Sequence, residues 1–136
     1  MADSQTNSIP LQPPDTPIIC SPYVEPTDHW VWNLSTGLPQ KVQGRRPASY
    51  FYRTTRSSGT AQLNRDDLPL VNELRKDVRR WRESNYENAS PVTKTLLRHW
   101  RREDRSRRLF FCQIEAVETI IYIREILAQG KTRRGN

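Results

Sequence analysis

Residues 69–84 read PLVNELRKDVRRWRES, and this stretch decides the class of fold. Its apolar side chains recur at helical spacing, at Leu70, Val71, Leu74, Val78 and Trp81, so it predicts an amphipathic helix. Basic side chains fill the positions between them and are expected on the outer face, at Arg75, Lys76, Arg79, Arg80 and Arg82. The acidic pair at residues 66–67 precedes these bases, which is the order that a helix dipole favours.

Two further helices are expected on the C-terminal side of this stretch. Ser90 followed by Pro91 predicts an N-cap and the first position of a helix that runs to about Trp100. Its apolar face is expected at Val92, Leu96, Leu97 and Trp100. A third helix is predicted from Cys112 to about Ala128, with a wide apolar face at Val117, Ile120, Ile121, Ile123 and Leu127. The chain has few other large aliphatic residues to cover that face, so part of its partner surface is expected to be missing.

Short strands are expected on the N-terminal side. Residues 29–33 (HWVWN) are rich in aromatic and β-branched side chains, and residues 35–39 (STGLP) supply turn chemistry before a second strand at 40–43. Residues 50–52 (YFY) form a third extended stretch, and residues 54–65 are expected to be a polar loop. The predicted fold class is therefore α+β, a small antiparallel β-hairpin or sheet followed by about three helices, with a disordered Pro-rich N-terminal arm.

The expected organisation has four segments. Residues 1–27 are expected to form a flexible arm, because they are rich in proline. Residues 28–66 are expected to form a small β region, because they contain strand-like patterns. Residues 67–108 form a basic helical region, and residues 109–136 hold the last helix. A chain of 136 residues has room for one small domain.

The positive charge is regional. Residues 44–108 contain 17 Lys and Arg against 8 Asp and Glu, whereas the whole chain carries a formal net charge of +7. Arg outnumbers Lys by 18 to 4, which favours planar, bidentate contacts with phosphate. DNA is the expected partner. The candidate DNA-binding residues are Arg45, Arg46, Arg75, Arg79, Arg80, Arg82, Arg101, Arg102, Arg105, Arg107 and Arg108.

Other chemistry finds little support in the sequence. Cys20 and Cys112 lie far apart and His29 and His99 are isolated, so no catalytic constellation and no metal site is predicted. The triplet at 130–132 (GKT) is not a phosphate-binding loop, because Glu125 stands where the loop needs its first glycine. Neither a signal segment nor an apolar run of membrane-spanning length is present, so a cytoplasmic protein without membrane contact is expected.

The most informative motif is FCQIEAV at residues 111–117. The primary amide of Gln113 can donate and accept one hydrogen bond in a plane, which matches the edge of adenine. Phe110 or Phe111 could stack on the base. Taken alone, a Gln in this position is more often an ordinary first-turn residue.

This motif resembles the adenine-reading Q motif of superfamily-two helicases of the DEAD/DEAH type, although Cys112 stands where restriction-type translocases have Tyr. Residues 29–32, 41–52 and 70–75 look like the N-terminal region of type III restriction enzyme helicase subunits. The resemblance covers roughly residues 25–136. It implies an N-terminal fragment of an ATP-dependent restriction endonuclease, in which Gln113, Phe111 and Phe110 bind the adenine of ATP.

In that family the Q-motif helix precedes a phosphate-binding loop, an acidic metal-binding motif and usually a nuclease module. The resemblance therefore implies ATP and Mg²⁺ as cofactors of a longer parent, with helicase and nuclease domains missing here and a methyltransferase subunit as a further partner. The fragment alone is not expected to be an enzyme. The alternative hypothesis is a self-contained small basic DNA-binding or adaptor protein.

Overall fold

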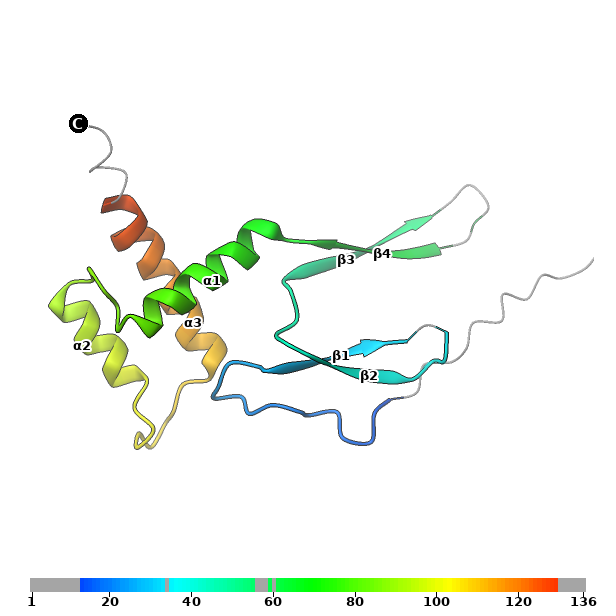
Figure 1. Ribbon diagram of the computed structural model, residues 1–136, viewed down its shortest axis with the longest axis horizontal. Helices are drawn as coiled ribbons and strands as arrows, with labels where there is room; N and C mark the ends of the chain where they lie inside the picture. The colour runs from blue at the N-terminus through cyan, green and yellow to red at the C-terminus, as the bar shows by residue number, and fades with distance from the viewer. Residues whose placement is uncertain (1–12, 34, 56–58, 60, 130–136) are drawn as a thin grey trace, which may run out of the picture. The chain divides into compact units, whose positions relative to one another are not determined.

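The computed structural model describes residues 13–33, 35–55, 59 and 61–129, which fall into two compact units, Met1–Arg46 and Pro47–Asn136 (Figure 1). The predicted α+β class is confirmed, since both units contain an antiparallel hairpin and the second adds three helices. The single β region expected over residues 28–66 is instead divided between the two units.

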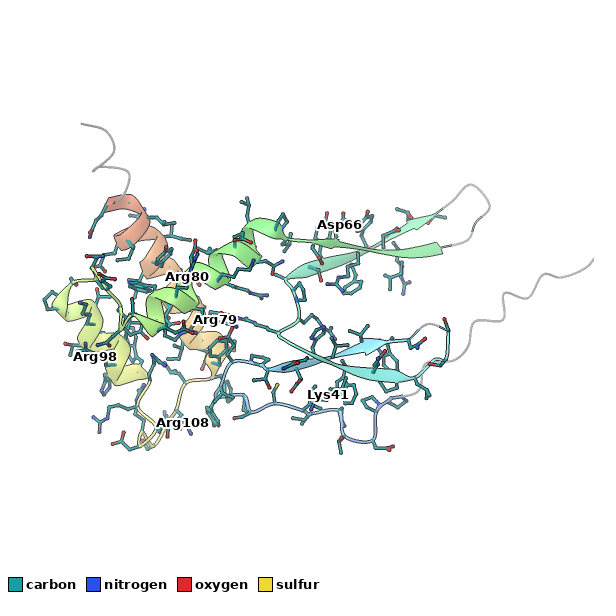
Figure 2. All side chains as sticks on the ribbon, viewed as in Figure 1. Lys41, Asp66, Arg79, Arg80, Arg98 and Arg108 are labelled. Carbon is teal, nitrogen blue, oxygen red and sulfur yellow. The ribbon has the colours of Figure 1, made fainter. Side chains whose placement is uncertain are left out.

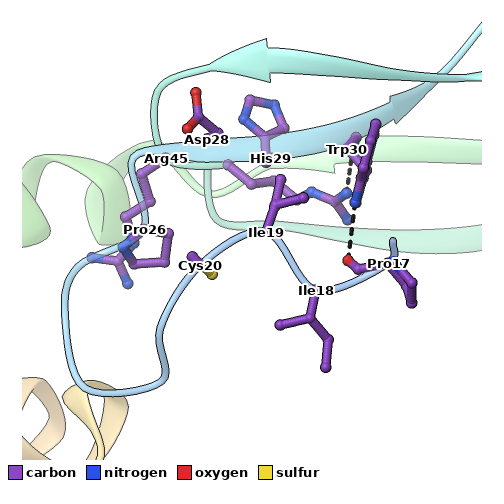
Figure 3. Close-up of a pocket in the computed structure, with 10 residues that line it drawn as sticks. Pro17, Ile18, Ile19, Cys20, Pro26, Asp28, His29, Trp30 and Arg45 are labelled. Carbon is purple, nitrogen blue, oxygen red and sulfur yellow. Dashed lines mark hydrogen bonds between the residues drawn. The ribbon is translucent and has the colours of Figure 1, made fainter. Parts of the chain in front are cut away.

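The first unit is built on a hairpin of strands β1 (Asp28–Trp32) and β2 (Pro39–Gln43), as predicted. The segment before β1 lies against this hairpin, because the Trp30 indole Nε1 donates to the Pro17 carbonyl at 3.0 Å (Figure 3). An ion pair between Arg45 and Glu25, 3.3 Å apart, adds a second attachment. These two contacts join residues 13–27, where prolines favour an extended chain, to other residues of the same unit. Residues 1–12 lie outside the described part.

The second unit begins with another hairpin, β3 (Ser49–Thr55) and β4 (Ala61–Asp67), and the polar loop predicted over 54–65 is wrong. Cross-strand polar pairs stabilise it, with Tyr50 Oη donating to Asp66 Oδ2 at 3.2 Å and Asn64 Nδ2 donating to Thr54 Oγ1 at 2.8 Å. Because β4 has almost no apolar residues, hydrophobic alternation could not reveal it.

Helix α1 (Pro69–Glu83) follows β4 directly, and helix α2 (Pro91–Trp100) follows after a short loop. Ser90 caps α2 as predicted, since its Oγ accepts from the Thr93 N–H at 3.2 Å. The cap residue of α1 is Leu68, whose side chain makes no capping bond, so the acids at 66–67 belong to β4 and do not cap the helix.

The third helix, α3 (Phe111–Ile121), continues as a π-helical segment η1 (Tyr122–Leu127). It begins one residue earlier than predicted, and the π-helical turns were not predicted. Both α1 and α2 contact α3. This arrangement places the start of α3 in the same compact unit as the basic helices.

The core of the second unit is small and aromatic. Trp81 of α1 meets the ring of Tyr86 edge-on at 4.9 Å and the ring of Tyr122 at 5.5 Å, and the buried Leu97 of α2 belongs to the same cluster. Tyr86 reaches the core from the loop between α1 and α2 with a φ of 60°, a left-handed conformation that side chains rarely adopt. Burial of its ring offsets the cost of that conformation.

The apolar faces predicted for the helices are only partly correct. Val78 and Trp81 of α1 and Leu97 of α2 are buried, but Leu70 is 85% exposed and Val92 is 68% exposed. Both exposed residues stand near the first turn of their helix, and the covered part of each helix lies farther along.

Candidate functional site

The start of α3 holds Gln113 in a fixed orientation. Phe110 is the N-cap residue, and its backbone N–H donates to the Gln113 side-chain oxygen at 2.9 Å. The Gln113 N–H donates back to the Phe110 carbonyl at 3.0 Å. The Gln113 side chain thus acts as a helix-capping group, and this contact ties the plane of its amide to the backbone of Phe110. Both residues are exposed, Phe110 to 44%.

Phe111 has a different environment from Phe110. It is half-buried in the first position of α3, and the guanidinium of Arg82 lies over its ring, with Cζ 5.1 Å from the ring centroid. This is a cation–π contact between α1 and α3. Cys112, the residue that follows, is exposed.

Arg82 is held in this position by a buried carboxylate. Glu118, in the third turn of α3, has no exposed surface, and the Arg82 side chain is only 10% exposed. Arg82 Nε donates to both Glu118 oxygens, at 3.0 and 2.8 Å, and its Nη2 donates at 2.5 Å. The placing of Arg82 on the outer face of α1 is therefore wrong. The buried carboxylate of Glu118 draws the Arg82 side chain inward.

Tyr86 completes the surroundings of Glu118. Its hydroxyl donates to Glu118 Oε1 at 2.7 Å and accepts from Arg101 Nη1 at 3.1 Å. Burial, followed by the bond to Glu118, raises the pKa of Tyr86 to about 12, so the phenol stays protonated and remains a donor. Four side chains from α1, the following loop, the end of α2 and α3 therefore form one polar network.

Most of the arginines predicted to bind DNA are exposed in the second unit; Figure 2 labels Arg79, Arg80, Arg98 and Arg108. The exposed members of the predicted set in this unit are Arg79, Arg80, Arg101, Arg102, Arg107 and Arg108. Two of them have acidic neighbours, because Arg80 pairs with Asp77 and Arg102 pairs with Asp104. Arg75 and Arg105 are half-buried. The helical unit thus presents basic side chains from α1 and from the segment between α2 and α3.

The other two predicted DNA contacts, Arg45 and Arg46, belong to the first unit. They line a pocket of about 430 Å³ together with Trp30 and residues 17–20 (Figure 3). Arg45 pairs there with Glu25, and Arg46 donates to the Trp30 carbonyl. Both arginines therefore help to fold the first unit.

A shallow groove of about 310 Å³ lies between α1 and α3. Its lining is mainly apolar and includes Val71, Leu74, Cys112, Ala116 and Ile120. Its lining residue Cys112 stands between Phe111 and Gln113 in the sequence.

Gln113 and Phe110 offer an amide and an aromatic ring at one helix start. No group of three or more His, Cys, Asp or Glu side chains within the described ranges could hold a metal ion. The GKT triplet at 130–132 lies outside the described residues. None of the described helices is both long and apolar enough to cross a membrane.

Comparison with known proteins found no counterpart for this chain. Neither the protein-family models, nor the curated proteins, nor the solved structures gave a match. Two candidate features remain from the geometry: the exposed basic surface of the helical unit, and the start of α3 with the buried Glu118 network behind it.

Sequence reasoning missed Glu118 and Tyr86. One signal was present for Glu118, because it stands four residues after Ile114 and four before Tyr122, within the apolar spacing of the helix. An acid at such a position needs a buried partner. For Tyr86, between Asn85 and Glu87 in a polar loop, no such signal exists.

Proposed function

We propose that this chain contacts DNA and the adenine of ATP as the N-terminal region of an ATP-dependent, restriction-type DNA helicase. In this proposal the helical unit supplies phosphate contacts, and the start of α3 supplies Gln113 and an aromatic ring for the base. A phosphate-binding loop and Mg²⁺ ligands would come from a motor domain of the same assembly. A nuclease module and a methyltransferase subunit are further proposed partners.

The observation that carries the proposal is the geometry at the start of α3. Gln113 is exposed in the third position of the helix, its amide is held by the Phe110 N–H, and the Phe110 ring is exposed beside it. An amide with a fixed plane beside an aromatic surface is suited to a purine, since the base can stack while its edge forms hydrogen bonds. The similarity of residues 111–117 to the Q motif supports the same role.

The basic surface supports the DNA part of the proposal. Arg79 of α1 is exposed, as are Arg107 and Arg108 in the segment between α2 and α3 of the same unit. Arginine forms bidentate contacts with phosphate, and several such contacts give an affinity that falls steeply with salt.

A third feature supports a covering domain. Ile120 is 64% exposed, and Ile123 and Leu127 on the following π-helical segment are also exposed. Apolar side chains gathered on one helical element are typical of a surface that another protein surface covers. We propose that the motor domain packs there.

DNA binding is tested with the 136-residue chain and a short fluorescein-labelled duplex, by anisotropy over a range of salt concentrations. The logarithm of the affinity should fall linearly with the logarithm of the salt concentration, by about 0.9 per phosphate contacted. The double variant Arg107→Gln/Arg108→Gln should lower this slope by about 2. Arg65→Gln is the matched control, because Arg65 is an exposed arginine of the same unit that pairs with Asp67 within β4. An unchanged slope in the double variant, or no binding at low salt, would refute the DNA contact.

The ATP part makes a separate prediction. The chain alone should hydrolyse no ATP, because the groups that hold phosphate and Mg²⁺ are proposed to lie elsewhere. Steady hydrolysis by the purified chain, sensitive to an inactivating substitution within it, would contradict the assignment to a helicase fragment.

One observation favours the alternative of a self-contained DNA-binding protein. The second unit has its own buried core around Trp81 and Leu97 and its own satisfied polar network. A sharp two-state thermal transition of the chain would favour this alternative. A broad transition with dye binding to apolar surface would favour the helicase fragment.

A further inference from the structure

We propose that the buried Arg82–Glu118 ion pair is the positioning element of the adenine site. It fixes Phe111 as a structural wall and leaves Phe110, together with Gln113, as the pair that contacts the base. This inference rests on the proposed function and deepens it, because the sequence left open which phenylalanine stacks.

Glu118 fixes the orientation of the Arg82 guanidinium. Three donor–acceptor contacts of 2.5–3.0 Å join its guanidinium to Glu118 in a forked geometry. Such a fork fixes the plane of the guanidinium as well as its position. Since the Glu118 carboxylate is buried and also accepts from Tyr86, the guanidinium has little freedom to rotate.

This guanidinium covers one face of the Phe111 ring. Arg82 lies 5.1 Å from the centroid of Phe111, and a base cannot stack on the face that it occupies. Phe111 is also half-buried, whereas 44% of Phe110 is exposed. The two neighbouring rings thus have separate tasks, one facing the protein interior and one facing solvent.

A hydrogen bond joins Phe110 to Gln113. The Phe110 N–H donates to the Gln113 side-chain oxygen, so the ring and the amide share one local frame. Phe111, the next residue, anchors that frame to α1 through Arg82. If the anchor is weakened, the helix start that carries Phe110 and Gln113 is no longer held against α1, and adenine binding weakens although neither residue has changed.

The different roles of Phe110 and Phe111 can be observed directly, because the chain contains three phenylalanines. The remaining one, Phe51, lies in β3 and serves as an internal reference. Incorporation of 4-fluorophenylalanine gives three ¹⁹F signals, which single Phe→Leu variants assign. Adenosine is the probe because it has no phosphate that could bind the arginines, and guanosine is its control. We expect adenosine to move the Phe110 signal more than that of Phe111 and to leave Phe51 unchanged.

The positioning role is tested with Arg82→Lys, which keeps the charge but loses the fork. We expect the Phe111 signal to move before any ligand is added, and the apparent affinity for adenosine, read from Phe110, to fall at least threefold. Arg65→Lys is the matched control, since Arg65 is an exposed arginine of the same unit that pairs with Asp67 in β4, and it should leave both readings unchanged. Circular dichroism confirms that each variant is folded.

Phe110→Leu keeps the test decisive if Arg82→Lys does not fold, because Phe110 is exposed. It should lower adenosine affinity at least fivefold, as expected when one stacking contact is lost. An adenosine response of Phe111 alone, or unchanged affinity in Phe110→Leu, overturns the inference while the adenine site stands. If adenosine moves neither signal, the adenine site itself is refuted, and the inference with it.

Discussion

Replacing Glu118 by Gln tests the central feature of the second unit, the buried carboxylate. The side chain keeps its shape, but the negative charge is removed from a position with no exposed surface. Arg82 would then retain a positive charge at 10% exposure without its counter-ion. The new side-chain NH₂ group would also face either the N–H donors of Arg82 or the hydroxyl of Tyr86. That hydroxyl already accepts a hydrogen bond from Arg101.

The expected loss of stability follows from these contacts. Removing one partner of a buried ion pair costs about 3–5 kcal/mol, because the remaining charge is left without compensation. The total free energy of unfolding of a small domain is only about 5–15 kcal/mol. Glu118→Gln should therefore remove a large part of the stability of the helical unit. The double variant Glu118→Met/Arg82→Met should lose much less, since no buried charge remains.

Urea denaturation followed by far-ultraviolet circular dichroism measures both variants. Glu73→Gln is the control, because Glu73 forms an exposed pair with Lys76 within α1, and it should change stability by less than about 0.5 kcal/mol. A loss below about 1 kcal/mol for Glu118→Gln would refute the reasoning. So would a double variant less stable than the single one, because the cost would then not come from an unpaired buried charge.

Two titrations and one substitution test other contacts of the second unit. In the folded state the pKa of Tyr86 is raised from its unfolded value of 10.0 to about 12. Its contribution to folding stability is therefore complete below pH 10 and is lost as the pH rises through about 12. Tyr86→Phe should abolish this pH-dependent loss of stability in alkaline unfolding. Burial tends to raise the pKa of Glu125, but bonds from Ser90 and Thr93 outweigh it and lower the pKa below 4.5. The contribution of Glu125 to folding stability should therefore be present above pH 4.5 and be lost on further acidification. Acid unfolding of Glu125→Gln should lack this pH-dependent loss of stability. Ser90→Ala should cost about 1 kcal/mol in urea denaturation through loss of the α2 cap.

The helices could be predicted because their signals are local. Ser90 and Pro91 mark the start of α2 by capping chemistry, and the spacing of Val78 and Trp81 marks the buried side of α1. The first hairpin was equally readable, from a turn sequence between two short extended stretches. These elements depend on neighbours along the chain, which a single sequence shows directly.

The second hairpin and the polar core could not be predicted, because they depend on residues far apart in sequence. Strand β4 is stabilised by pairing with β3 and by cross-strand contacts such as that between Tyr50 and Asp66. Arg82 and Glu118 are 36 residues apart, and only folding brings them together. At the candidate site, the motif predicts a role for Gln113, but its bond to the Phe110 N–H and the Arg82 guanidinium over the Phe111 ring are seen only in the structure.

The burial of Glu118 also explains why apolar side chains of the last helix remain exposed. Ile114, Glu118 and Tyr122 follow one another at spacings of four residues, so turning Glu118 toward Arg82 turns this row toward the core. Ile120 and Ile123 then point away from it, and both are exposed. A helix packed only by apolar contacts would rotate to bury these isoleucines, and the Arg82–Glu118 pair opposes that rotation. The polar network thus sets two surfaces at once, the aromatic pair at the start of α3 and the apolar face proposed to meet the motor domain.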